Sequence, residues 1–251
     1  MRPGDINVNG VLISDHKIYC STRPDIETPK RVFQKLTVFG GAGDIIYDDG
    51  GYENTPISLS LWMNGTEDEI SSNRRLVNKI FPQASYLEII FWFDPTLTYY
   101  CYVSDPAKFT NKRMHNGVID IDLSLSCKPY KRFNQSSGMT EVIRATNNQK
   151  IVNNTDEYQL PVIKITGNGN ISLTLSGTTM RFNNVDDNII IDCEKLYLYK
   201  DQYSLAKSRN DRTNDLEFPF IYPKAQNNKN TISWTGNVSS VEIRPNWRTL
   251  V

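Results

Sequence analysis

Strict alternation of apolar and polar residues restricts the fold of this chain more than any other feature. In Gly117–Leu125 (GVIDIDLSL), isoleucine or leucine occupies every second position from 119 to 125, with acidic or hydroxyl side chains between them. A period of two places the apolar side chains on one face of a β-strand and the polar ones on the other. Three further segments follow this rule: Ser58–Trp62, Asn170–Leu175 and Leu196–Tyr199. The sequence therefore predicts a mainly β protein.

One segment carries helical signals instead. Thr66 and Glu69 have the spacing of a capping box, and acidic residues fill the first turn of Glu67–Ile80. Basic residues lie toward its end, as the helix dipole favours. Apolar residues recur at helical spacing, and Pro82 limits continuation. We predict one α-helix at about 67–80, packed on a sheet with its charges in solvent.

A glycine-rich segment, Gly40–Gly51 (GGAGDIIYDDGG), has glycines at both ends of a short apolar centre. This pattern predicts a hairpin or projecting loop at about residues 40–52. A phosphate-binding loop would need GxxxxGK[ST], or GxGxxG at the start of a helix, and the segment has neither. We therefore predict a subunit interface rather than an active site. Its proposed residues are Ile45, Ile46, Tyr47 and Tyr52.

Charge and cysteine usage favour no particular ligand. Lys plus Arg and Asp plus Glu number 28 each, so nothing in the balance favours nucleic acid or an anionic membrane. The cysteines are Cys20, Cys101, Cys127 and Cys193, and no two share a metal-type spacing. Two disulfides remain an alternative to the favoured interpretation, reduced and partly buried thiols. The start MRPGDINVNG lacks the apolar region of a secretory signal, and no apolar run is long enough to span a bilayer.

Motifs for catalysis are absent from the sequence. His16 and His115 are isolated from other ligand-type residues, and neither GxSxG nor HExxH occurs. The pair Asp120 and Asp122 shares a strand face, but it is the polar side of an alternating strand rather than two carboxylates facing across a sugar. The pair at 186–187 lacks a DxDxDG-type calcium loop. We expect no catalytic residues, no metal site and no cofactor.

The composition shifts near Tyr130. Residues 131–157 are polar, rich in asparagine and poor in large apolar side chains, which is typical of a linker followed by a weak first strand. A length of 251 residues allows two ordinary domains. We predict domains at 1–134 and 135–251.

The second half carries an ordered series of features. Leu160–Phe182 (LPVIKITGNGNISLTLSGTTMRF) combines a strand led by a proline, a Gly/Asn turn and an alternating strand. Asn188–Tyr199 (NIIIDCEKLYLY) follows, and Phe218–Leu250 contains an "I.W.G" strand before PNWRTL. In this order and spacing, the features resemble the C-terminal domain of the distal tail proteins of long, flexible-tailed bacteriophages.

The first half is similar to the same family. The glycine-rich segment leads into ISLSLW, and the helix, YLEIIFWFDP, YYCYV and GVIDIDLSL follow in order, with LSCKP (Leu125–Pro129) at the close. The resemblance covers nearly the whole chain. It departs at the glycine-rich segment, where many relatives have a compact Gly-Arg-Asp-Gly core. Here Asp48, Asp49 and Gly50 occur with no arginine before them, so the contacts of that arginine are in doubt.

The resemblance implies a structural, non-enzymatic hub in the tail tip of the virion, assembled in the bacterial host cytoplasm. It implies an N-terminal β-sandwich or split-barrel-like domain that forms a hexameric ring, closed with help from the helix and a belt at the glycine-rich segment. Implied partners are other copies of the chain (a homohexamer, with stacked rings as an option), the tail tube protein, the tail-associated lysin or tail fibre protein, and a receptor-binding or upper baseplate protein. DNA would pass through the lumen without specific binding, and no membrane insertion is expected.

The implied C-terminal domain is a galectin-like β-sandwich, similar to carbohydrate-binding modules. An alternative function is therefore a virion-associated carbohydrate-binding module in host adhesion. Its candidate sugar face is Arg181, Asn183 and Trp234, although the favoured interpretation of Trp234 is a residue of the sandwich core. These residues do not make a working galectin site, because no histidine lies in the second half of the sequence.

Overall fold

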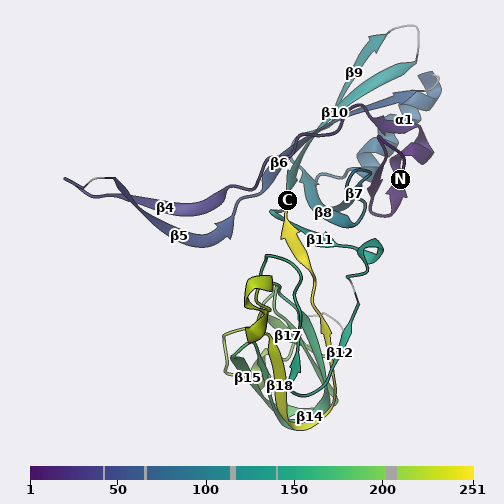
Figure 1. Ribbon diagram of the computed structural model, residues 1–251. Helices are drawn as coiled ribbons and strands as arrows, with labels where there is room; N and C mark the ends of the chain where they lie inside the picture. The colour runs from purple at the N-terminus through teal and green to yellow at the C-terminus, as the bar shows by residue number, and fades with distance from the viewer. Residues whose placement is uncertain (42, 65–66, 114–116, 140, 202–207) are drawn as a thin grey trace. The chain divides into compact units, whose positions relative to one another are not determined.

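The computed structural model describes residues 1–41, 43–64, 67–113, 117–139, 141–201 and 208–251. The chain divides into two compact units. Unit 1 comprises Met1–Arg132 with Leu250–Val251, and unit 2 comprises Phe133–Thr249. Both are built mainly from antiparallel strands, which confirms the predicted mainly β class (Figure 1).

Unit 1 is centred on one antiparallel sheet with the strand order β2-β1-β7-β8-β10-β6-β3, while β9 pairs with β10 and β11 with β8. Its strands are β1 (Ile6–Val8), β2 (Val11–Leu12), β3 (Ile18–Cys20), β6 (Thr55–Asn64), β7 (Leu87–Phe91), β8 (Leu97–Val103), β9 (Lys108–Arg113), β10 (Val118–Cys127) and β11 (Tyr130–Phe133). A separate two-stranded sheet contains β4 (Arg31–Thr37) and β5 (Asp44–Tyr52).

The longest pairing of unit 1 joins β6 to β10 over ten residues, from Val118 opposite Asn64 to Cys127 opposite Thr55. Alternate side chains of both strands are buried. The buried row of the two strands contains Ile57, Leu59, Leu61, Met63, Ile119, Ile121, Leu123 and Leu125. The alternation in GVIDIDLSL therefore sets which face of the sheet joins the core.

The helix α1 (Glu67–Ile80) has the predicted bounds. Val77 and Ile80 are buried, and the guanidinium carbon of Arg74 lies 5.5 Å from the centre of the Phe109 ring on β9. The helix thus packs with its apolar side on unit 1 and keeps its basic residues exposed. Thr66, the expected cap, lies outside the described residues.

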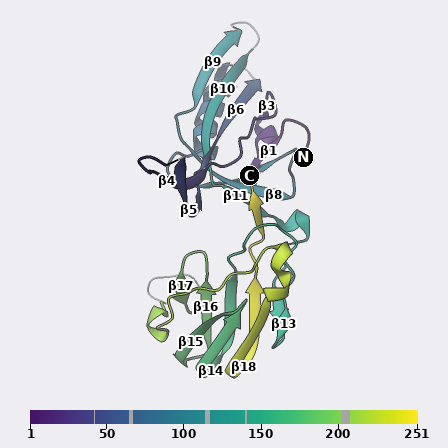
Figure 2. The ribbon, with the colours of Figure 1, turned by 60° about the vertical axis from the view of Figure 1, so that its left-hand side comes forward.

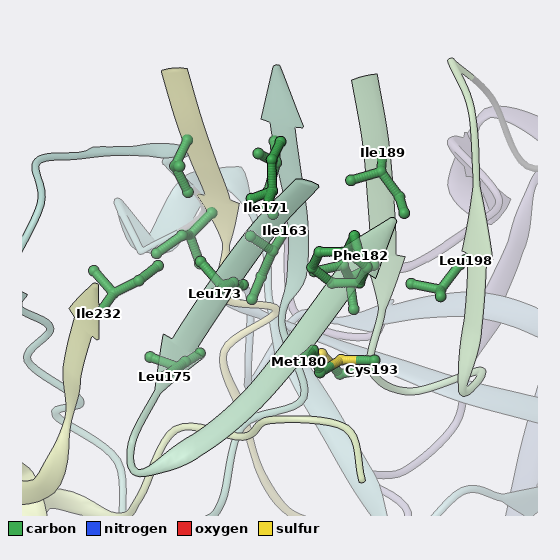
Figure 3. Close-up of a cluster of buried hydrophobic side chains, with 14 of the residues drawn as sticks. Ile163, Ile171, Leu173, Leu175, Met180, Phe182, Ile189, Cys193, Leu198 and Ile232 are labelled. Atoms are coloured by element: carbon green, nitrogen blue, oxygen red, sulfur yellow. The ribbon is translucent and has the colours of Figure 1, made fainter. Parts of the chain in front are cut away.

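Unit 2 contains one curled sheet with the order β12-β18-β14-β16-β17; β13 pairs with β18 and β15 with β14 (Figure 2). Its strands are β12 (Ile143–Ala145), β13 (Gln149–Lys150), β14 (Val162–Leu175), β15 (Thr178–Val185), β16 (Asn188–Asp192), β17 (Tyr197–Tyr199) and β18 (Thr231–Arg244); β19 (Arg248–Leu250) follows. Both halves of β14 face one core: Ile163 from the first half lies with Leu173 and Leu175 from the second (Figure 3).

Two glycines allow β14 and β18 to approach closely where the sheet curls. A Cβ atom on Gly167 would clash with the carbonyl oxygen of Asn237, and one on Gly236 would clash with that of Asn170. The register of the two strands shifts on both sides of this point. Because the clashing atoms are backbone, no rotamer change relieves them, so the curl requires glycine at both positions.

Three fully buried side-chain amides fix the irregular segments of unit 2. Asn153 and Asn230 each donate a hydrogen bond to the Tyr222 carbonyl at 3.0 Å. The Gln159 carbonyl oxygen accepts from the backbone N–H of Arg248 at 2.7 Å. Since an unpaired buried amide is costly, each of these bonds holds a loop in one conformation.

The glycine requirement is testable by comparing Gly236→Ala with Gly177→Ala. Both residues have a left-handed backbone, with φ of 102° and 91°, but only Gly236 has atoms within 4 Å of a built Cβ. Backbone strain is thus matched, and we expect Gly236→Ala to lower the free energy of unfolding by about 1–3 kcal/mol more than the control does. Urea unfolding followed by tryptophan fluorescence measures this difference. Equal losses of unfolding free energy in the two variants would show that the close approach of β14 and β18 tolerates a methyl group.

Candidate functional site

The strands β4 and β5 form a hairpin that pairs with no other described strand. We call Arg31–Tyr52 the arm; Figure 1 shows it as a long two-stranded ribbon leaving the sheet of unit 1. The expected hairpin at about 40–52 contains only the turn and the second strand. Gly50 and Gly51 do not form a second turn, because they lie within β5, where the register against β4 shifts. The first strand therefore comes from Arg31–Thr37.

Large apolar side chains of the arm are exposed to solvent. They are Phe33, Leu36, Val38, Phe39, Ile45, Ile46 and Tyr47, and the Phe39 side chain at the tip is fully exposed. An isolated two-stranded hairpin is at best marginally stable in water, and contiguous exposed apolar surface marks an interaction site. The arm thus has the properties of a segment that another surface covers.

The register divides the arm into two different faces. Tyr47 lies opposite Gln34 and Ile45 opposite Leu36, so these four side chains share one face. We call it the apolar face. The other face is mixed, because it alternates apolar with charged or hydroxyl side chains: Phe33, Lys35, Thr37, Asp44, Ile46 and Asp48. Of the predicted interface residues, Ile45 and Tyr47 are therefore on the apolar face and Ile46 on the mixed face.

The base of the arm is held by an arginine that the sequence analysis missed. Arg31 on β4 donates to the Asp48 carboxylate from two nitrogens, Nε to Oδ1 at 3.0 Å and to Oδ2 at 3.2 Å, and Nη2 to Oδ2 at 2.6 Å. Its Nη1 donates to the Tyr52 hydroxyl at 2.8 Å. Tyr52 is half-buried, with its ring 5.9 Å from that of Tyr130. Tyr52 thus joins the base of the arm to the ring of Tyr130 and to the guanidinium of Arg31.

The Arg31 guanidinium holds the pKa of the Asp48 carboxyl below its usual value, and the N–H of Gly50, which donates to the same carboxylate, acts in the same direction. Asp48 therefore stays ionised at neutral pH and pairs with Arg31 across the base of the arm. The signal for Arg31 in the sequence was its place at the start of an apolar, β-prone stretch that ends at Gly40.

The structure does not bring the candidate sugar-binding residues together. Arg181 and Asn183 are exposed on β15, and Arg181 pairs with Asp215 at 3.5 Å. Trp234 lies opposite the buried Leu173 and packs against the core of unit 2. Arg181 and Trp234 thus belong to opposite faces of the sheet.

The other sequence candidates are distributed without a shared centre. All four cysteines are buried and free. Asp186 pairs with Lys200 at 3.2 Å and Arg209 at 3.1 Å, and these cations lower its pKa. His115 lies outside the described residues. Within the described ranges, no group of three metal-ligating side chains gathers, and no helix is long and apolar enough to cross a membrane.

Fold and site together define a class: a two-unit, mainly β protein with a projecting hairpin whose large apolar side chains are exposed to solvent. No family model matches the sequence, and no curated protein matches it. Among solved structures, the chain is similar to the SPP1 Dit (gp 19.1) protein, described as a paradigm of the hub adsorption apparatus in phages that infect Gram-positive bacteria. The TM-score is 0.67 at 14% identity, over 98% of this chain and 99% of that one. The whole chain therefore shares the Dit fold.

The Arg31–Asp48 pair predicts a specific titration. Because the folded-state pKa of Asp48 lies below the unfolded value near 3.8, the pair stabilises the arm above that pH, and this stabilisation is lost as pH falls through the folded pKa. We expect Arg31→Ala to raise the Asp48 pKa toward 3.8 and Lys35→Ala to leave it in place. Carboxyl ¹³C shifts of aspartate-labelled protein measure both. An unchanged titration midpoint of Asp48 in Arg31→Ala would show that the ion pair with Arg31 does not lower the pKa of this carboxyl.

Proposed function

We propose that this chain is the distal tail protein of a long-tailed bacteriophage, a structural hub without enzymatic activity. Six copies form a ring that joins the tail tube to the tail-tip proteins and lets DNA pass through its centre. The observation that carries this proposal is the Dit fold over 98% of the chain, in combination with an arm whose apolar residues are exposed.

The arm supports a ring because it projects an apolar segment that can pack on a different surface of a neighbouring copy. A chain that extends an apolar segment and receives the same segment from a neighbour makes a heterologous contact, and such contacts close into a ring when the rotation fits. Uncovered strand edges and apolar side chains would otherwise invite uncontrolled pairing. In this proposal Ile45, Ile46 and Tyr47 are covered by the neighbouring copy, and Tyr52 holds the base of the arm.

A channel for DNA needs a polar lining without concentrated positive charge, because phosphates bind clustered lysine and arginine. The face of β6 and β10 opposite the core fits this need: Ser58 lies opposite Ser124, and Ser60 opposite Asp122. We assign this hydroxyl- and carboxylate-bearing face to the bore. DNA then passes without specific contacts.

The remaining partners follow from the hub role. One side of the ring meets the tail tube protein, and the other meets the tail-associated lysin or tail fibre protein. Unit 2, in which Arg181 and Trp234 lie on opposite faces of the sheet, serves as the mounting point for a receptor-binding or upper baseplate protein. The protein assembles in the host cytoplasm and functions in the virion at the tail tip.

Negative-stain electron microscopy and light scattering of the purified chain test the ring. We expect sixfold rings, single or stacked, and a weaker association in Ile45→Asp, which places a carboxylate on the apolar face. Loss of one buried isoleucine costs about 1.5–3 kcal/mol per contact, so each interface weakens at least about tenfold. Ile46→Asp tests the mixed face in the same way.

Leu216→Asp is the matched control, because Leu216 is 92% exposed and lies in unit 2, outside the arm. It should leave the rings intact. A wild-type protein that remains monomeric at tens of micromolar, or rings that tolerate charges on both arm faces, would refute an arm-closed ring.

A further inference from the structure

We propose that Cys101 and Cys127 are a modification site: a low-molecular-weight disulfide oxidises the pair to a disulfide that joins strands β8 and β10. In the structure both residues are free thiols. The inference concerns the stability of unit 1, so it goes beyond the hub function and does not depend on it. It is carried by the register of the two strands, the contact between the two thiols and the place of the pair in the sheet.

The two cysteines lie directly opposite each other where β8 pairs with β10. The N–H of Lys128 donates to the Tyr100 carbonyl at 2.8 Å, so residues 100 and 128 form a hydrogen-bonded pair. Because hydrogen-bonded and non-hydrogen-bonded pairs alternate along an antiparallel ladder, Cys101 and Cys127 form a non-hydrogen-bonded pair. The Cα atoms of such pairs are about 4.5 Å apart, and disulfides span about 4.4–6.8 Å between Cα atoms. The backbone therefore already has the spacing that a disulfide needs.

The side chains of the pair meet inside the core of unit 1. Both are fully buried, and the two thiols are hydrogen-bonded to each other. The other two cysteines have different surroundings. Cys20 lies opposite Leu61, and its thiol donates to the Thr22 carbonyl at 3.0 Å, while Cys193 belongs to unit 2. The fold thus selects one pair among the four cysteines.

The pair lies at a junction between two halves of the unit 1 sheet. Along the strand order, β2, β1, β7 and β8 are on one side of this junction, and β10, β6 and β3 are on the other. The register of β8 with β10 runs only from Leu125 opposite Val103 to Cys127 opposite Cys101, whereas that of β6 with β10 covers ten residues. A short ladder opens at a lower free-energy cost than a long one. A disulfide at its end would hold the two halves together.

The same junction controls how fast the pair reacts. The thiolate is the attacking species, and burial is the main cause that raises the pKa of the Cys101 thiol. A closed junction therefore protects the pair, and local opening of β8 from β10 admits a small reagent. In the proposed virion protein, the pair would be reduced in the host cytoplasm and oxidised outside it.

The chemistry is two successive thiol–disulfide exchanges. The thiolate of one cysteine attacks a sulfur of the reagent, whose S–S bond breaks and releases one small thiolate. The thiolate of the second cysteine then attacks the protein sulfur of the mixed disulfide, so that the Sγ–Sγ bond forms and the second small thiolate leaves. The two cysteine protons end on the two released thiols. Two cysteines are oxidised and one reagent disulfide is reduced, which balances without a further reactant.

Intact-mass measurement on the full chain tests the site. The wild-type protein is incubated with hydroxyethyl disulfide in sub-denaturing urea, which favours the open junction. We expect a product lighter by two hydrogen atoms, in which the tryptic peptides of Cys101 and Cys127 are linked. Cys20→Ala with Cys193→Ala keeps only this pair and should give the same product. Cys127→Ala removes one of the two thiols and should not lose the two hydrogens.

Thermal unfolding measures what the disulfide does. Because it closes the segment 101–127 in the unfolded chain, the oxidised wild type should unfold about 5 °C or more above the reduced protein, and dithiothreitol should reverse the shift. Cys127→Ala should show no rise after the same treatment. A chain that keeps its reduced mass, that carries the reagent on separate cysteines, or whose linked form unfolds at a lower temperature would overturn the site. None of these outcomes bears on the ring, which microscopy tests separately.

Discussion

The ten-residue pairing of β6 with β10 is the interaction on which unit 1 depends. It aligns two alternating strands so that their apolar rows fall on one face, and a slip by one residue would expose every one of them. The same pairing also fixes the position of the elements on both sides of β6 in the chain. The arm, which ends at Tyr52, precedes β6, which begins at Thr55, and α1 begins at Glu67, three residues after the end of β6 at Asn64. One strand, β6, thus separates the projecting hairpin from the helix in the chain. Because β6 is held in the sheet by β10, the base of the arm has a fixed position even though the arm itself is only weakly stabilised.

Unit 2 obtains its rigidity from different sources. Its two longest strands, β14 and β18, approach so closely at Gly167 and Gly236 that backbone replaces side chains as the contact. The buried amides Asn153, Gln159 and Asn230 then fix segments that no strand ladder reaches. Buried polar groups of this kind cost stability when a partner is lost, so they specify one loop arrangement rather than add much net free energy. A surface displayed on such loops is preorganised, which suits a mounting point for another protein.

The sequence predicted the elements that local physics determines. Periods of two gave the strands, and charge placement with apolar spacing gave the bounds of α1. It failed where tertiary context decides. The first arm strand was missed because nearly all of its side chains are exposed, so no buried face imposes a clean alternation on the sequence from 31 to 37. Arg31 was missed because its partner Asp48 is seventeen residues away and adjacent only across the hairpin. For Trp234 the sequence left two interpretations, a sugar face and the favoured sandwich core, and the structure packs this side chain against the core of unit 2.

The difference between the apolar face and the mixed face of the arm has a physical consequence for binding. A hairpin with large apolar side chains on both faces would bind any apolar surface, and zero net charge removes the long-range repulsion that opposes such contacts. Charges on the mixed face prevent this, because an unpaired Lys35 or Asp44 would be buried at a cost in a wrong contact. In the proposed ring, the apolar face supplies affinity and the mixed face rejects misaligned partners. An edge strand that stays open until the proposed neighbour docks needs both properties, so in this proposal the arm combines attraction on one side with discrimination on the other.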